Sequence, residues 1–317
     1  MKIVVTGSTG LVGTALVNAL TRDGHTVCRL LRRETTTGKK EPEKRGSAAQ
    51  FLDVAWDPED PGASSLADSQ GKVEGADGVV NLAGASIAGG RWTTERKMQL
   101  RSSRVRTTRA LVTALEKAKV RPKVFISASA IGIYGNRGDE VLTEESKAGE
   151  DFLAGLAREW EAAASQAQGL GARVVLARFG IILAKHGGAL PQMMRPFRFG
   201  AGGKIGSGQQ WMSWVTLEDV VAIMRFALEN AAVSGAVNVV APQPVRNAEF
   251  TKELARAMHR PALFPAPAFA LRLALGEMAD ALLLSSQRVE PTRLAQTDYR
   301  FLHPDLRSAL AAVLSAT

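Results

Sequence analysis

Cysteine is almost missing from this sequence: Cys28 is the only one in 317 residues. A single thiol cannot form an internal disulfide, and this suits a reducing compartment, so we expect a cytoplasmic protein. The four histidines are scattered along the chain and no cysteine cluster accompanies them. We therefore expect no metal site.

Long apolar runs are missing too. The longest lies between Pro267 and Leu284, and Arg272, Glu277 and Asp280 interrupt it. Charges at these positions exclude a membrane span and predict a buried or amphipathic helix. We therefore expect no membrane partner.

Signals of nucleic-acid binding are equally weak, although the formal net charge is +9. The 40 Lys and Arg residues are spread over the chain, and no zinc-binding or RNA-stacking motif accompanies them. A basic surface that attracts small anions is the simpler interpretation. We expect no nucleic-acid partner.

The first half of the chain alternates short apolar runs with longer helical patterns. Because parallel strands need crossover helices, this alternation predicts an α/β fold of the Rossmann type, a doubly wound parallel sheet with helices on both faces. Strands are predicted at residues 2–6, 26–31, 78–82, 123–127 and 173–177, and helices at 11–21, 94–119 and 151–168.

The second half is different, because glycines cluster between residues 187 and 208 and prolines between 242 and 267. Helical patterns resume at 248–258 and 268–284. We expect a smaller, mostly helical C-terminal lobe made of residues 185–212 and 241–317. It would pack on a Rossmann domain of residues 1–184, to which residues 213–240 return.

The strongest motif is a glycine loop, VVTGSTGLVG, between the first strand and the first helix. Gly7 permits a tight turn, Gly10 lets the backbone approach a pyrophosphate, and Gly13 lets the helix pack closely on the sheet. The free N–H groups and the positive end of the helix then favour an anion. We expect a dinucleotide to be bound here by Gly7, Thr9, Gly10, Leu11, Val12 and Gly13.

The end of the second strand indicates which dinucleotide is bound. An NAD site usually carries Asp or Glu there, about 20 residues after the loop. This sequence has Arg32 and Arg33 instead. A guanidinium can bind a 2′-phosphate that a carboxylate would repel, so we expect NADP(H). The alternative is that both arginines simply belong to the surface before a polar loop.

Several segments carry a family resemblance over essentially the whole chain. The loop TGSTGLVG matches the TGxxGxxG motif of extended short-chain dehydrogenases/reductases. Other segments resemble one atypical branch, the epimerase family proteins with a distinctive C-terminal domain. These segments are AWDP (55–58), NLAGASI (81–87), RW (91–92), SSRVRTT (102–108), SASAIGIYG (127–135), GSGQQWMSWV (206–215) and LGEMADALLLSSQRV (275–289).

The resemblance implies further cofactor contacts. Leu82 and Ala83 would pass the ribose and the pyrophosphate, and Arg104 and Ile182 would line the nicotinamide half. It also implies that the acid–base chemistry of this chain is unusual, as in the atypical branch.

The Tyr-x-x-x-Lys pair of most members of the superfamily is missing. In the helix DFLAGLAREWEAAA, Phe152 or Leu153 takes the place of the tyrosine, and Leu156 or Ala157 that of the lysine. The lysine normally lowers the pKa of the phenol, so that the phenol can transfer a proton near neutral pH. Its absence puts ordinary dehydrogenase or epimerase chemistry in doubt.

Three other hydroxyls are candidate substitutes. Ser127 and Ser129 lie near the end of the fifth strand, where the superfamily keeps its catalytic hydroxyl. The alternative for both is hydrogen bonding within a turn. Tyr134 is close in sequence, but a packed tyrosine is the favoured interpretation.

These features of the sequence are compatible with two alternative functions. The first is an NADP(H)-dependent oxidoreductase or epimerase-like enzyme acting on a small anionic metabolite such as a nucleotide sugar. A loop over the site could fold over that anion, with its arginines binding a phosphate or carboxylate, and ordinary surface charge is the alternative. The candidate residues of this loop are Arg195, Arg198, Lys204, Gln209, Gln210 and Trp211. The second is a non-catalytic NADP(H) sensor, since a fold alone does not specify a reaction. We expect a monomer or a homodimer.

Arg32→Ala should weaken the binding of NADPH by about tenfold to a hundredfold, because it removes a charged hydrogen bond to the 2′-phosphate. The binding of NADH, which lacks this phosphate, should change little. Titration of the nicotinamide fluorescence with each cofactor measures both effects. An equal loss for the two cofactors would contradict the NADP(H) assignment.

Overall fold

The computed structural model describes residues 1–32, 51–58 and 74–315. Its centre is a seven-stranded sheet in the order β11-β7-β5-β4-β1-β2-β3, and all neighbouring strands are parallel. The predicted doubly wound parallel sheet is therefore confirmed. Its strands are β1 (Lys2–Thr6), β2 (Thr26–Arg32), β3 (Phe51–Trp56), β4 (Gly78–Asn81), β5 (Val124–Ala130), β7 (Arg173–Phe179) and β11 (Gly235–Val239).

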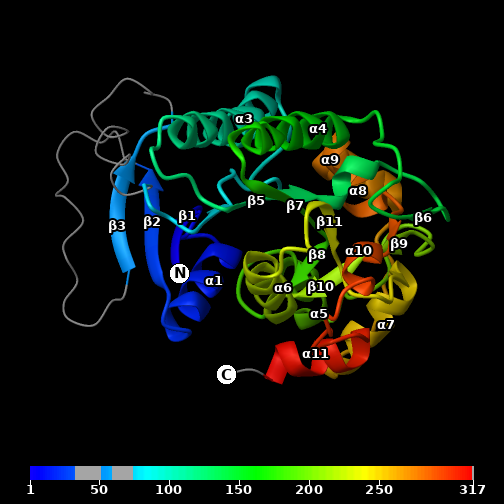
Figure 1. Cartoon of the computed structure of the whole chain (residues 1–317). Coiled ribbons are helices and arrows are strands. Elements are labelled where there is room, and N and C mark those ends of the chain that lie inside the picture. Colours follow the sequence, from blue (N-terminus) through cyan, green and yellow to red (C-terminus); the bar gives the residue numbers. More distant parts are fainter. Residues whose placement is uncertain (33–50, 59–73, 316–317) are drawn as a thin grey trace, which may run out of the picture.

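Two pairs of helices cover the two faces of this sheet (Figure 1). α1 (Leu11–Arg22) and α6 (Leu217–Glu229) pack on one face, and α3 (Thr94–Glu116) and α4 (Phe152–Ser165) on the other. Ile3 and Val5 of β1 belong to the core under the first pair, and Val4 to the core under the second. Because successive side chains of a strand point to opposite faces, a central strand covered on both sides has to be apolar throughout.

Side chains cap three of these helices, and α1 is the exception. Thr93, Asp151 and Thr216 each accept a hydrogen bond from the backbone N–H three residues later, at the starts of α3, α4 and α6. α1 instead follows Gly10, which has no side chain to do this. The first N–H groups of α1 therefore remain available to another acceptor.

The C-terminal lobe consists mainly of short helices around a core of its own. Leu190, Phe250 and Leu310 belong to this core, together with the fully buried Trp214. The helices are α5 (Leu190–Arg198), α7 (Asn247–Met258), α8 (Ala268–Leu275), α9 (Glu277–Ala279), α10 (Thr292–Ala295) and α11 (Leu306–Ser315).

Short paired strands and single turns complete the chain. β8 (Ile181–Leu183) pairs with β10 (Trp214–Thr216), β9 (Trp211–Met212) with β12 (Val245–Arg246), and β6 (Val141–Leu142) with β13 (Arg288–Val289). 3₁₀ turns follow β5 at Ile131–Tyr134 and α4 at Gln166–Leu170.

The single helix predicted over residues 268–284 is wrong. Gly276 has φ +62° and ends α8 at Leu275, and the chain continues through α9 into a π-helical segment, Asp280–Leu284. A glycine with positive φ ends a helix without steric cost. Within the ranges that the structure describes, no helix has the length and apolar character needed to cross a membrane.

The fifth strand is longer than predicted. β5 runs through Ser127 and Ser129 to Ala130, and its neighbour β7 extends to Phe179. Both serines are therefore strand residues, and their side chains lie between the sheet and its covering elements instead of in a turn.

Candidate functional site

Gly7, Gly10 and Gly13 have three different roles at the turn between β1 and α1. Gly7 has φ +65°, and a Cβ there would lie 2.5 Å from the carbonyl carbon of Leu82. A Cβ on Gly13 would lie only 2.1 Å from the carbonyl oxygen of Gly7. A Cβ on Gly10 would meet just that same oxygen, at 3.3 Å. The packing of the protein itself requires the first and third glycines, whereas the second faces open space.

The open side of this loop is the positive end of α1. The first turn of α1 contains no acidic residue, and the N–H groups of Leu11, Val12 and Gly13 have no acceptor within the helix. The hydroxyl of Ser8 is buried without a hydrogen-bond partner among the described residues. Thr9 beside it is exposed. These donors fit the negative charge of a pyrophosphate.

The loop after β4 lies directly against Gly7. The N–H of Leu82 donates to the carbonyl oxygen of Thr6 at 3.2 Å, and Leu82 and Ala83 are half-buried. A Cβ on Gly84 would lie 3.1 Å from the guanidinium carbon of Arg104. The loop thus connects the glycine turn to the side chain of Arg104.

Arg104 is a buried cation in this part of the site. Its guanidinium donates to the carbonyl oxygens of Ala85 (2.9 Å) and Leu100 (3.1 Å), and no carboxylate among the described residues pairs with it. Burial, together with the charge of Arg96, lowers the pKa of Arg104 to about 10, so it stays charged at neutral pH. Burying an unpaired charge is costly, and an anionic ligand would offset that cost.

Ile182 approaches the same loop from a distant part of the chain. It lies half-buried in β8, shortly before Gly187 and Gly188. A Cβ on Gly188 would lie 3.0 Å from the side chain of Leu11 and 3.6 Å from the carbonyl oxygen of Ile182. The structure therefore brings the glycine turn and the start of α1 together with Ile182.

Arg32 lies at the same edge of the sheet. It is the exposed last residue of β2, beside Trp56 in β3. Leu30, two residues earlier, pairs with Thr6, the last residue before the glycine turn. Arg33 lies outside the described residues, so its role remains a prediction.

Ser127 belongs to a buried set of polar side chains, which we call the Asn81 network: Thr6, Asn81, Thr108 and Ser127. The Asn81 amide accepts from Thr6 Oγ1 (2.7 Å) and donates to Thr108 Oγ1 (2.8 Å) and to Ser127 Oγ (3.3 Å). All four side chains are at most 1% exposed. This network ties β1, β4, β5 and α3 together where the site loops begin.

Ser129 and Tyr134 belong to a second buried set, the Arg178 network. Arg178 makes two hydrogen bonds of 2.8 Å to the carboxylate of Glu161, and Ser129 Oγ donates to the same carboxylate at 2.6 Å. The Tyr134 hydroxyl accepts from Arg178 (2.9 Å) and donates to Asn238 Oδ1 (2.6 Å). Burial raises the pKa of the Tyr134 phenol, and the side chain has no exposed surface. This geometry fits the packed-tyrosine interpretation.

Apolar side chains occupy the position of the missing Tyr/Lys pair. Phe152, the first residue of α4, packs edge-to-face on Trp92 with 5.3 Å between the ring centroids. Leu156, one turn later, is buried in a cluster with Leu100. None of these side chains can transfer a proton, so this turn of α4 supplies no acid–base pair.

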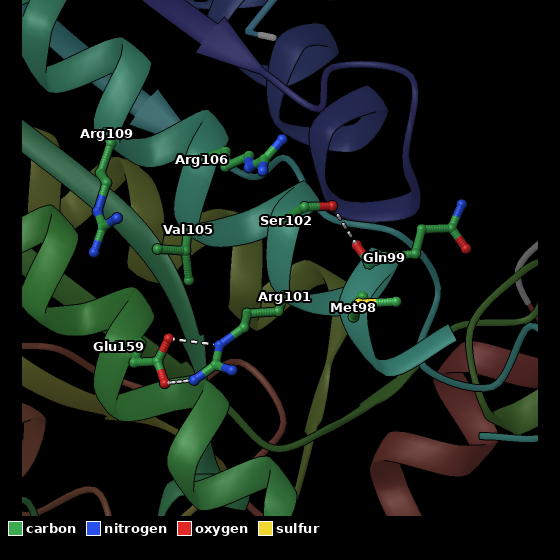
Figure 2. A pocket seen from close by; sticks show the side chains of 8 residues that line it. All are labelled: Met98, Gln99, Arg101, Ser102, Val105, Arg106, Arg109 and Glu159. Atoms are coloured by element: carbon green, nitrogen blue, oxygen red, sulfur yellow. Dashed lines mark hydrogen bonds and ion pairs between the residues drawn. The ribbon is translucent and has the colours of Figure 1, made fainter. Parts of the chain in front are cut away.

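A separate groove of about 480 Å³ lies beside α3 and α4 (Figure 2). Arg101 donates to the carboxylate of Glu159 across it, at 2.7 Å for one of the two hydrogen bonds. None of the predicted site residues contributes to the groove, which is lined by Met98, Gln99, Arg101, Ser102, Val105, Arg106, Arg109 and Glu159.

Sequence reasoning gave no role in the site to four residues that shape it: Trp92, Glu161, Arg178 and Asn81. An asparagine at the end of an apolar strand was a usable signal for Asn81, since a buried amide needs partners. Nothing in the local pattern distinguishes Glu161 or Arg178 from surface charges. Their pairing becomes visible only when α4 lies across β7.

Comparison with known proteins finds relatives along the whole chain. The model of the NAD dependent epimerase/dehydratase family matches residues 3–240, and that of a domain of unknown function (DUF1731) matches residues 266–313. The epimerase family protein YfhF of Bacillus subtilis is 40% identical, over 99% of this chain and 98% of its own. The resemblance noted in the sequence is confirmed.

Solved structures similar to this one include two that share more than 30% of its sequence. The human epimerase family protein SDR39U1 (isoform 2), crystallised with NADPH, has a TM-score of 0.85 at 31% identity and covers 100% of both chains. A nucleoside-diphosphate sugar epimerase of Corynebacterium glutamicum has a TM-score of 0.76 at 35% identity, covering 99% of this chain and 58% of the other.

Gly13→Ala should lower the free energy of unfolding by about 1–3 kcal/mol, because the new methyl group must displace the backbone of Gly7. Gly10→Ala should change it by less than about 1 kcal/mol, since its methyl group enters open space. Urea unfolding followed by circular dichroism measures both. Equal losses for the two variants would contradict the assigned packing of the loop.

Glu161→Ala should lower the free energy of unfolding by about 3–5 kcal/mol, because Arg178 would remain buried without its partner. Glu159→Ala is the matched control on the same helix: it breaks the exposed pair with Arg101 and should cost less than about 1 kcal/mol. If both variants lost the same stability, Arg178 and Glu161 would not form a buried pair.

Proposed function

Because the chain belongs to the NAD dependent epimerase/dehydratase family, we propose that it is an NADP(H)-binding oxidoreductase or epimerase-like enzyme. Its substrate is a small anionic metabolite, such as a nucleotide sugar. In this proposal residues 1–184 and 213–240 hold the cofactor, and residues 185–212 and 241–317 hold the substrate.

The glycine turn carries this proposal. Gly10 leaves open space in front of the uncapped end of α1, and the buried, unpartnered hydroxyl of Ser8 lies in the same turn. Such a turn, between the first strand and helix of a doubly wound sheet, binds the pyrophosphate of a dinucleotide. Leu82, Ala83 and Ile182 would flank the bound cofactor.

Two observations support NADP(H) over NAD. Arg32, and not an acidic residue, stands at the end of β2, and the similar human protein was crystallised with NADPH. The buried charge of Arg104 provides a further cation close to the loop that would pass the ribose and pyrophosphate.

The substrate class rests on charge and on relatives. No Asp or Glu occurs between Glu161 and Glu218, whereas Arg195, Arg198 and Lys204 do. A basic segment of this kind attracts anions. The C. glutamicum protein is described as a nucleoside-diphosphate sugar epimerase, which supports a substrate of the same class.

Bound NADP(H) supplies the hydride chemistry, and the chain positions it and excludes water. A proton relay through Ser127 or Ser129 remains a prediction. Of the two, Ser129 has an ionisable partner, Glu161, but Arg178 already holds that carboxylate through two hydrogen bonds. Tyr134 is held between Arg178 and Asn238, away from solvent.

A second function, a non-catalytic NADP(H) sensor, is favoured by one observation. The place of the Tyr/Lys pair is taken by Phe152, packed on Trp92, and by Leu156. A protein that only binds the cofactor needs no proton transfer at this point.

Mixing the purified protein with NADPH and a panel of nucleotide sugars, aldehydes and ketones distinguishes the two functions. An enzyme that reduces one of these classes will consume the nicotinamide absorbance, and product analysis will reveal an epimerase that makes no net change in redox state. Tight NADPH binding with no product from any compound would favour the sensor.

Arg104→Met should weaken NADPH binding by about tenfold to a hundredfold, because it removes the buried positive charge. Arg106→Met changes an exposed arginine of the same helix and serves as the control, which should bind NADPH as the unmodified protein does. Calorimetric titration measures both. Equal NADPH affinity in the two variants would show that Arg104 does not contribute to cofactor binding.

A further inference from the structure

The most exposed large apolar side chains of the described chain gather in one part of the C-terminal lobe. Phe199 and Leu273 are 80% exposed, Phe269 73%, Leu263 72% and Phe264 61%. The next most exposed are Leu302 at 59%, Met98 at 58% and Val120 at 56%. Isolated exposed leucines are ordinary, but several aromatic and leucine side chains in one region indicate an interaction surface.

Backbone contacts bring the two segments that carry these residues together. The N–H of Phe264 donates to the carbonyl oxygen of Gly202 (3.0 Å), and that of Ala266 to Lys204 (2.9 Å). The segment after Phe199 therefore runs alongside residues 264–266, and α8 begins directly after them. Phe269 and Leu273 are four residues apart in α8, so they share one helix face.

α8 is itself unusual, because none of its residues is fully buried. Its sequence, AFALRLAL, contains one charge, Arg272, which pairs with Asp280. Packing into the lobe therefore does not account for the apolar character of its outer face.

Cations without acidic partners lie in the same two segments or just before them in the chain. Arg195, Arg198, Lys204 and Arg260 are exposed, and none pairs with a carboxylate among the described residues. The two segments that form the surface contain no Asp or Glu, since none occurs between Glu161 and Glu218 or between Glu253 and Glu277. The surface thus combines exposed aromatic side chains with uncompensated positive charge.

We propose that this surface, formed by Phe199, Leu263, Phe264, Phe269 and Leu273 with the four cations, docks the protein on an anionic lipid bilayer. The aromatic and leucine side chains enter the interface while the cations face the lipid headgroups. Such docking differs from a membrane span, but it departs from the expectation of no membrane partner that the sequence suggested. It shares Arg195, Arg198 and Lys204 with the basic segment that the proposed function assigns to the substrate.

The charge distribution argues against a second copy of the chain as the occupant. A twofold interface places the same patch of both copies face to face. Arg195, Arg198, Lys204 and Arg260 would then approach their own copies with no acid in the two segments to compensate them, and like charges in an interface are unfavourable. A negatively charged surface would instead attract the same cations.

Sedimentation with vesicles tests this proposal on the full chain. Vesicles of phosphatidylcholine with phosphatidylglycerol should bind the protein, and vesicles of phosphatidylcholine alone should not. The double variant Phe269→Asn/Leu273→Asn should lower the partition coefficient by at least about tenfold, because it removes two side chains that enter the interface. Met98→Gln/Val120→Asn changes exposed apolar residues elsewhere and should bind as the unmodified protein does.

Charge variants complete the test. Arg195→Gln/Arg198→Gln should weaken binding by roughly fivefold per arginine, whereas Arg106→Gln/Arg109→Gln, with the same change of net charge on α3, should weaken it much less. NADPH binding by the apolar double variant serves as the check that it is folded.

Three results would overturn the proposal. The first is equal binding to neutral and anionic vesicles. The second is an equal loss of vesicle affinity in the two double arginine variants. The third is no vesicle binding at all. Dimerisation that Phe269→Asn/Leu273→Asn abolishes, without vesicle binding, would assign the surface to a second copy instead.

Discussion

The close approach of two backbone segments at Gly7 is the constraint on which the rest of the site depends. A Cβ there would overlap the carbonyl group of Leu82, and a Cβ on Gly13 would overlap the carbonyl oxygen of Gly7. The turn is therefore closed by the protein on two sides and open on the third, at Gly10 and the uncapped start of α1. Because a helix end with free N–H groups favours negative charge, the open side is the place for an anion.

Two buried polar networks hold the elements around this turn. The Asn81 network joins β1, β4, β5 and α3, and the Arg178 network joins β5, β7 and α4. Buried polar groups are costly unless all of them find partners, so each network specifies one arrangement of its strands and helices. The hydroxyls of Ser127, Ser129 and Tyr134 take part in these networks, and this involvement restricts them as proton donors.

The two parts of the molecule also differ in how completely they bury apolar surface. The parallel sheet is covered on both faces, and its central strands β1, β4 and β5 are almost entirely buried. The C-terminal lobe has its own core but leaves α8 and the segments around it with large apolar side chains in solvent. Exposed apolar surface of this kind marks an interaction site, and the charges near it indicate what kind of partner binds there.

The sequence by itself determined the fold class, the glycine turn and the absence of the Tyr/Lys pair, because these depend on local patterns and on residue types. Periodicity found the central strands, but it missed the break at Gly276, since a continuous apolar pattern does not reveal a positive φ. Tertiary structure alone decided that Glu161 pairs with Arg178, that Trp92 covers Phe152, and that Arg104 is buried without a carboxylate. These facts depend on which surfaces of distant segments meet, and no single segment contains that information.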